Sequence, residues 1–201
     1  METTVAREAT YADLEAVPPH LVAEILDGKL FIHPRPAPRH GAAATALSAE
    51  LTGPFQRGRG GPGGWVFIVE PELHLGRNVV VPDIAAWCTN RMTAIPETAW
   101  IDLVPDWICE VLSPSTASLD RGRKRRIYAK AGLQHLWLLE PIEEQLEVFE
   151  LSNGKWLLFD TFENDAEVAA PPFKVAPFPL TVLWPFKTTN KAAPPTRASD
   201  V

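Results

Sequence analysis

Residues 106–141 limit the fold more than any other stretch of the chain. Two short segments here, DWICEVLS (106–113) and HLWLLEP (135–141), are almost continuously apolar, as is typical of strands buried on both faces. The segment between them begins as a loop, continues with helical periodicity and ends at Gly132, a residue that suits a helix C-terminus. A strand, a helix and a second strand in this order form a crossover between parallel strands. The sequence therefore predicts an α/β fold, a single domain with a mixed central sheet flanked by helices.

The rest of the chain supplies further helices and strands around this unit. Gly, Pro and Asn-Gly or Asp-Gly pairs mark most of the boundaries. The N-terminal part is predicted to contain a helix over 10–17 with Thr10 as N-cap, a segment of helical or mixed spacing over 21–26, a turn at Asp27–Gly28 and a strand over 29–33. A small-residue helix follows over 40–57, up to the breaker Gly53–Pro54, and then a flexible turn over 57–64. The remaining predicted elements are one or two strands over 65–76 in a hairpin with a strand over 79–87, a loop with a short helical turn over 96–106, and a closing hairpin over 145–162 around Asn153–Gly154.

The composition is that of a globular protein large enough for one core. The chain has 201 residues, of which 46% are hydrophobic and 22% charged. A net charge of −6 is unlike that of proteins that coat nucleic acid nonspecifically, but it leaves room for a local basic patch. We expect one domain over residues 10–186, an N-terminal tail over 1–9 and a disordered C-terminal tail over 187–201.

Cysteine usage and hydropathy indicate the compartment. Cys88 and Cys109 lie in apolar runs without metal-ligand spacing, so we expect buried, reduced thiols. The N-terminal segment lacks the apolar region of a signal peptide, and no apolar run approaches the ~20 residues of a membrane span. These features predict a cytoplasmic protein without a membrane segment.

Three charged residues stand where the pattern expects apolar side chains. Asp83 follows a proline inside VVVPDIAAW and either makes a turn or holds a cation. Alternation along residues 107–112 places Glu110 on the same face as Ile108 and Leu112. Helical spacing places Lys124 on the face of Tyr128, towards the sheet.

Two carboxylates and a lysine form a recognisable chemical unit. Hard oxygen ligands hold Mg²⁺, which polarises a phosphoryl oxygen and lowers the pKa of a bound water. A neighbouring ammonium positions that water and neutralises charge in the transition state. Phosphodiester hydrolysis with Mg²⁺ or Mn²⁺ needs this set.

The chain also resembles a known family. PDIAAW and EVLSPSTASLDRGRKRRIYAKAGLQHLWLLEP are similar to the Uma-two family of restriction-endonuclease-like proteins, in the PD-(D/E)xK nuclease superfamily. AEILDGKLFIHPRPAPRHG, GGWVFIVEPELHLG, PPF and LTVLW extend the resemblance over roughly residues 10–186. It implies Asp83 and Glu110 as metal carboxylates. The lysine of the short motif is missing, because Leu112 stands there, and the resemblance places it at Lys124.

The resemblance also implies supporting roles. Glu24 would add a carboxylate from an N-terminal helix, and Glu70, in preference to Glu72, would reach the metal from a neighbouring strand. Tyr128 would orient the lysine helix, and Asp120 would cap its N-terminus rather than ligate. Independently of the resemblance, His40 follows a predicted loop that could approach the site, but we expect a surface or capping role for it.

The basic run on the predicted helix has two interpretations. Such runs are usually a solvated face, but this one lies beside a proposed phosphate site. On the second interpretation the nucleic-acid contacts are Arg121, Arg123, Arg125 and Arg126.

These features together predict a metal-dependent DNA endonuclease, catalytic through Asp83, Glu110 and Lys124. RNA remains open as a substrate, and a homodimer is expected by analogy. The alternatives are a catalytically inactive nucleic-acid-binding or regulatory module of the same fold, an interaction protein without metal binding, and a phosphodiesterase for small nucleotides.

Overall fold

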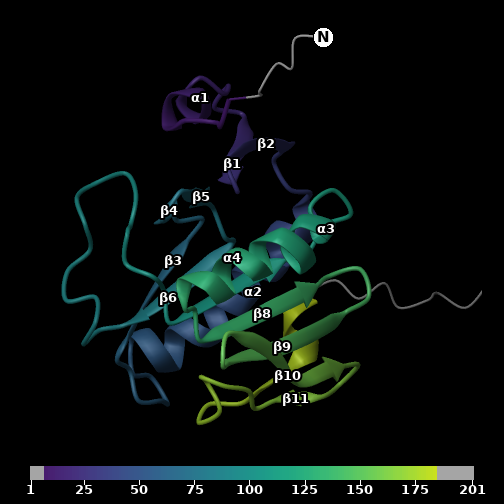
Figure 1. The fold of residues 1–201 in the computed structure, drawn as a ribbon. Helices are drawn as coiled ribbons and strands as arrows, with labels where there is room; N and C mark the ends of the chain where they lie inside the picture. Colours follow the sequence, from purple (N-terminus) through teal and green to yellow (C-terminus); the bar gives the residue numbers. More distant parts are fainter. Residues whose placement is uncertain (1–6, 185–201) are drawn as a thin grey trace, which may run out of the picture.

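The computed structural model describes residues 7–184 (Figure 1). Its centre is a six-stranded sheet in the order β10-β9-β8-β7-β6-β3. Within it β7 and β8 are parallel, and the other neighbouring pairs are antiparallel. The strands are β3 (Trp65–Val69), β6 (Ile84–Cys88), β7 (Trp107–Val111), β8 (His135–Glu140), β9 (Gln145–Ser152) and β10 (Lys155–Glu163). The predicted mixed sheet is confirmed.

The predicted strand–helix–strand unit forms as expected. The connection between β7 and β8 is one helical stretch of three parts, α3 (Ala117–Leu119), the π-helical η2 (Asp120–Lys124) and α4 (Arg125–Ala131). Gly132 ends it with a positive φ of 84°, a conformation that glycine adopts without steric cost. The closing hairpin of β9 and β10 also forms, with Asn153 and Gly154 at positive φ.

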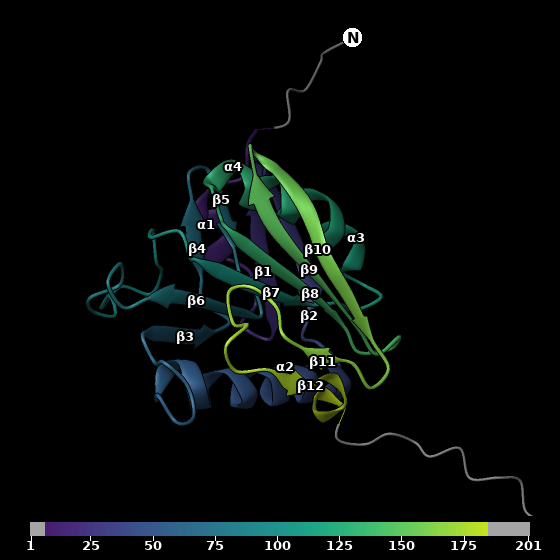
Figure 2. The same ribbon diagram turned by 90° about the horizontal axis from the view of Figure 1, so that it is seen from below.

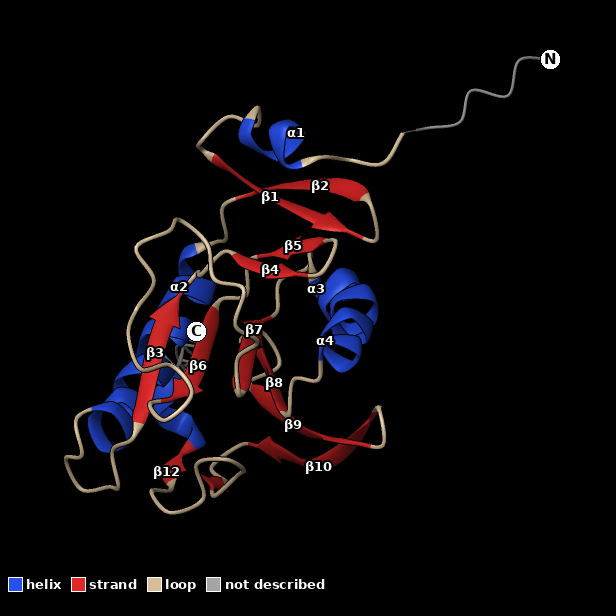
Figure 3. Cartoon of the chain, turned by 60° about the vertical axis from the view of Figure 1, so that its left-hand side comes forward, coloured by secondary structure: helices blue, strands red, loops and turns tan. Residues whose placement is uncertain are grey.

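Helices lie on opposite sides of this sheet, with α2 (Pro38–Leu51) on one side and α4 on the other (Figure 3). The side of α2 is completed by η1 (Thr52–Gln56) and by the C-terminal elements β11 (Glu167–Val168), β12 (Phe178–Pro179) and η3 (Leu180–Leu183) (Figure 2). Strand β7 alternates as predicted: Trp107, Cys109 and Val111 pack on the α2 side, and Ile108 on the α4 side. The register therefore directs Glu110 toward α4 and η2.

A second, four-stranded sheet in the order β2-β1-β5-β4 adjoins the α4 side. Its strands are β1 (Leu21–Leu26), β2 (Lys29–Pro34), β4 (Leu73–Leu75) and β5 (Asn78–Val80). The helical interpretation of residues 21–26 is therefore wrong, because they pair residue by residue with β2. The predicted hairpin of 65–76 with 79–87 is confirmed, because β3 pairs with β6 and β4 pairs with β5, both antiparallel. The two pairs belong to different sheets, which the sequence did not predict.

Three smaller predictions have mixed outcomes. Helix α1 (Tyr11–Glu15) begins after Thr10 with a capping box, as predicted. Gly53–Pro54 does not end the second helix, which continues through both residues as η1. Residues 96–106 contain no helical turn, and Ile101 bridges to Leu73 instead.

The predicted tail over 187–201 lies outside the described residues. Within the described residues, no helix has the length and apolar character that a membrane span needs.

Candidate active site

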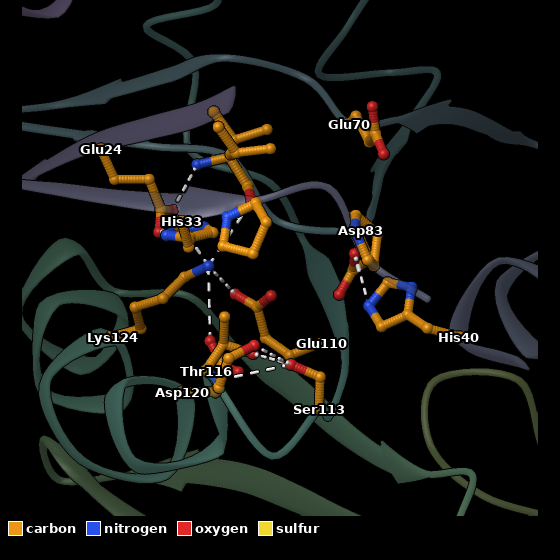
Figure 4. Close-up of a pocket in the computed structure, with 15 residues that line it drawn as sticks. Glu24, His33, His40, Glu70, Asp83, Glu110, Ser113, Thr116, Asp120 and Lys124 are labelled. Carbon is orange, nitrogen blue, oxygen red and sulfur yellow. Dashed lines mark hydrogen bonds and ion pairs between the residues drawn. The ribbon is translucent and has the colours of Figure 1, made fainter. Parts of the chain in front are cut away.

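A small pocket of about 60 Å³ lies where the two sheets meet the start of the crossover helix (Figure 4). Its charged side chains come from elements far apart in sequence. Glu24 is on β1, His40 on α2, Asp83 directly before β6, Glu110 on β7 and Lys124 on η2. The fold thus brings together the three residues predicted to be catalytic.

The Lys124 ammonium is the centre of this cluster. Its Nζ lies 2.9 Å from Glu110 Oε1, 3.0 Å from Glu24 Oε1 and 3.6 Å from Asp120 Oδ1. All four side chains are at most 5% exposed. A buried charge is stable only when it is paired, so one ammonium here compensates three carboxyl groups.

Burial and mutual charge shift the ionisation of this cluster. Burial raises the pKa of Glu110 well above its usual range, against the attraction of Lys124. Burial alone would lower the pKa of Lys124, but Glu110 and Glu24 outweigh it and hold that pKa well above its ordinary value. Tyr128 is fully buried on α4 and donates its hydroxyl hydrogen bond to Glu110 Oε1. Its predicted inward orientation beside Lys124 is what the structure has.

Asp83 sits on the opposite side of the pocket, and both of its oxygens are engaged. Oδ2 accepts the backbone N–H of Val111 at 2.7 Å, which ties the residue to the end of β7. Oδ1 lies 3.1 Å from His40 Nε2. Burial lowers the pKa of His40, but the hydrogen bond and charge of Asp83 raise it further, so the net shift is upward.

Glu24 belongs to the wall of the pocket, but it comes from strand β1 and not from the predicted N-terminal helix. One oxygen accepts the Val81 N–H at 2.8 Å and also faces Lys124, while the other lies 3.8 Å from His33 Nε2. Glu24 therefore links the segment before Asp83 to the lysine.

Glu70 and Glu72 occupy different places. Glu70 lies on the rim beyond Asp83, is about half exposed, and forms a loose ion pair of 3.7 Å with Arg35 (Figure 4). Glu72 does not line the pocket; its Oε1 accepts the Tyr11 hydroxyl at 2.9 Å and lies 2.8 Å from His74 Nε2. Of the two, only Glu70 borders the site.

The carboxylates of the pocket can be compared with the ligands that a divalent metal requires. Within residues 7–184 no three His, Cys, Asp or Glu side chains gather into a metal cage. Mg²⁺ seldom uses one: it keeps several waters and binds through one or two carboxylates together with substrate phosphates. Asp83 and Glu110 supply two such carboxylates, and Figure 4 shows the Glu110 oxygen that does not face Lys124 on the side of Asp83. The residues fit a metal held by two carboxylates.

Most of the predicted nucleic-acid arginines have partners inside the protein. Arg121 pairs with Glu147, Arg123 pairs with Asp27 at 3.1 Å, and the Arg125 guanidinium lies 4.2 Å from the centre of the Phe149 ring. Arg126 is exposed, and no partner for it occurs in the part of the chain that the structure describes. Their contact with nucleic acid stays a prediction.

Two site residues were assigned other roles from the sequence. His40 is buried against Asp83 rather than at the surface. Asp120 lies inside the helical stretch and pairs with Lys124, so it is not an N-terminal cap; Thr116 precedes the helix. The i, i+4 spacing of Asp120 and Lys124 was a usable signal for this pair. No local pattern marks His40, whose partner is far along the chain.

A mixed sheet with carboxylates on adjacent strands and a lysine from the crossover helix defines an α/β protein of the restriction-endonuclease-like class. The family model of Uma2, described as "Putative restriction endonuclease", matches residues 9–181, and the chain belongs to this family. The chain is also similar to a solved structure, "a putative nuclease belonging to DUF820 from Anabaena variabilis ATCC 29413". That likeness has a TM-score of 0.71 and 22% identity, covers 88% of this chain and 98% of that chain, and concerns the fold. No curated protein matches the chain.

Proposed function

We propose that this protein is a metal-dependent endonuclease that hydrolyses phosphodiester bonds in DNA. The observation that carries the proposal is the convergence of Asp83, Glu110 and Lys124 in one pocket from three separate elements. A purely structural ion pair needs no second carboxylate facing it across a pocket. Membership of the Uma2 family supports the same reaction class.

Asp83 and Glu110 would hold Mg²⁺ or Mn²⁺. When bound, such a metal polarises the phosphoryl oxygen and acidifies a water. Hydrolysis forms a bond from the water oxygen to phosphorus and breaks the bond to one bridging oxygen. Lys124, which lies beside Glu110, would hold that water and offset the charge that develops on the phosphoryl oxygens.

The remaining residues would act through these three. His40 and the Val111 N–H fix the Asp83 carboxylate, and Tyr128 fixes Glu110. Glu24 shares its oxygen with Lys124 and so positions the ammonium, while Glu70 could join the metal only from the rim. An oriented set of this kind is what pre-organised catalysis requires.

The substrate and assembly are further parts of the proposal. We infer DNA as the substrate, with RNA as an alternative that the same chemistry allows. Arg121, Arg123, Arg125 and Arg126 would contact the phosphate backbone, and a homodimer would present two pockets. One domain over residues 10–186 would contain the whole site.

A cleavage assay tests the proposal. Purified protein is incubated with supercoiled plasmid, single-stranded DNA and RNA, each with Mg²⁺, Mn²⁺ or EDTA. We expect cleavage with either metal and none with EDTA. Tight binding of nucleic acid without any cleavage would instead favour an inactive binding module of the same fold.

A further inference from the structure

A second hollow adjoins the candidate active site and has no role in the proposed reaction. It has a volume of about 280 Å³, and it shares Val22, Glu70 and Val81 with the wall of the active-site pocket. It lies between the end of α1 and strand β1. Its volume is near the lower end of the ~300–1,000 Å³ of sites that hold a small molecule, whereas the active-site pocket is several times smaller.

The lining of this hollow differs from that of the active site. One wall is apolar and stiff and is built from Leu14, Val17, Pro18 and Pro19. Apart from Arg35, the charged side chains that line the hollow are acidic, namely Glu15, Glu70 and Glu72, so a phosphate group would be repelled from that part of it. An uncharged, flat group with hydrogen-bond donors suits an apolar wall faced by carboxylates.

Arg35 stands at the junction of the two spaces. Its side chain is 59% exposed, and its guanidinium donates a hydrogen bond to the Pro19 carbonyl at 3.3 Å and pairs with Glu70 only at 3.7 Å. Three prolines at 34, 36 and 38 restrict the backbone around it. Because Pro34 and Pro36 line the active-site pocket, Arg35 is carried on its rim. A guanidinium in this place can contact a phosphate that enters or leaves the site.

We propose that the hollow is a subsite for one unpaired nucleobase next to the scissile phosphate. Arg35 would contact the adjoining phosphate of the bound strand. This inference rests on the proposed nuclease function and names the substrate form: a strand that is unpaired at the cut. A base that is stacked in a duplex must leave its partner to enter a hollow in the protein surface, whereas a base in a single strand or a frayed end enters without an unpairing cost. Among residues 7–184 no aromatic ring lines the hollow, so the base would be held by aliphatic contact and not by stacking.

The carboxylates also select among bases. Glu15 and Glu70 accept hydrogen bonds from exocyclic amino groups, which cytosine and adenine carry and thymine lacks. We therefore expect cytosine to bind more tightly than thymine, by about fivefold for one hydrogen bond.

Fluorescence anisotropy of the full chain tests this proposal. The probes are labelled oligo(dC), oligo(dT) and a blunt duplex, measured in EDTA to prevent cleavage. We expect oligo(dC) to bind about fivefold more tightly than oligo(dT) and both single strands to bind more tightly than the duplex. Val17→Trp fills the hollow and should abolish the difference between dC and dT, and Arg35→Ala should weaken both single strands.

Arg59→Ala is the matched control, because it removes an exposed arginine that lines neither the hollow nor the active-site pocket and is not among the proposed nucleic-acid contacts. It should leave the dC to dT ratio unchanged, and circular dichroism checks that each variant is folded. Equal binding of oligo(dC) and oligo(dT) by wild type would overturn the subsite, as would a ratio that survives Val17→Trp. Failure of the nuclease function has a different signature: wild type would then cut none of the nucleic acids with Mg²⁺ or Mn²⁺, whatever the dC to dT ratio measured in EDTA.

Discussion

Lys124 Nζ lies 2.9 Å from Glu110 Oε1, and both side chains are at most 4% exposed. This pair connects the parallel strand β7 to the helix that leaves it, so the same crossover that defines the fold also delivers the lysine to the site. Glu24 and Asp120 face the same ammonium. Lys124 therefore has a structural role as well as its proposed catalytic one.

Lys124→Met should lower the free energy of unfolding by about 3–5 kcal/mol at pH 7, because three buried carboxyl groups lose their counterion. The loss should shrink at pH 5, where protonation neutralises carboxyl groups whose pKa burial has raised. Urea denaturation at the two pH values measures this. Lys130→Met, an exposed lysine on the same helix, should change stability by less than about 0.5 kcal/mol. An equal loss at both pH values would show that packing, not charge, is responsible.

Tyr128→Phe should destabilise the protein by about 1–3 kcal/mol, since it removes the hydroxyl donor of the buried Glu110 carboxyl and leaves Lys124 as its remaining partner. Tyr11→Phe is the matched control. Its hydroxyl also donates to a glutamate, Glu72, but at a partly exposed site where water can replace it, so a smaller loss is expected. Denaturation midpoints of the two variants compare them directly, and a larger loss for Tyr11→Phe would contradict the burial argument.

The His40–Asp83 contact predicts that the free energy of unfolding falls as pH rises. Although burial opposes it, Asp83 raises the pKa of His40 above its ordinary value, so the folded state binds a proton more tightly than the unfolded chain does. The stabilisation is complete below about pH 6.5 and is lost as pH rises through the raised folded-state pKa. His40→Asn should flatten this part of the stability profile between pH 5.5 and 8.5. NMR titration of the His40 ring that gave a pKa at or below that of free histidine would disprove the contact.

Amide variants of the four predicted metal carboxylates should differ in their affinity for a divalent metal. Isothermal titration with Mn²⁺ should show weaker binding by about 10–100-fold in Asp83→Asn and Glu110→Gln. Glu70→Gln should change the affinity by about twofold at most, because Glu70 lies on the rim beside Arg35. Glu24→Gln should fall between these, since Glu24 acts on Lys124. Strong loss in Glu70→Gln alone would move the metal to the rim.

Local periodicity predicted much of the site and of the central sheet. Alternation along β7 placed Glu110 on the face of Ile108, and the i, i+4 rule placed Lys124 beside Tyr128, because both rules describe one element at a time. The same rules cannot assign the secondary structure of a segment whose apolar residues fit both the helical and the strand period. Leu21, Val22, Ile25 and Leu26 suit a helix as well as a strand, and only pairing with β2 decides between them.

Features that depend on distant partners could not be read in this way. His40 is buried because β6 begins beside α2, and the arginines of the basic run are engaged by Glu147, Asp27 and Phe149 on other elements. The sequence of the basic run does not distinguish an arginine that is engaged by another side chain of the protein from one that faces solvent. Likewise, the division of residues 65–80 between two sheets follows from tertiary packing and not from the strand pattern.

The most direct test of the central claim is the initial rate of DNA cleavage by wild type, Glu110→Gln and Glu150→Gln in the same Mn²⁺ buffer. Both variants change a glutamate to its amide, but only Glu110 lines the pocket, whereas Glu150 lies level with His135 at the other end of the strands. We predict a loss of at least about a hundredfold in Glu110→Gln, equivalent to roughly 2.7 kcal/mol of transition-state stabilisation, and a rate near wild type in Glu150→Gln. Equal rates for wild type and Glu110→Gln would contradict the assignment of this pocket as the active site.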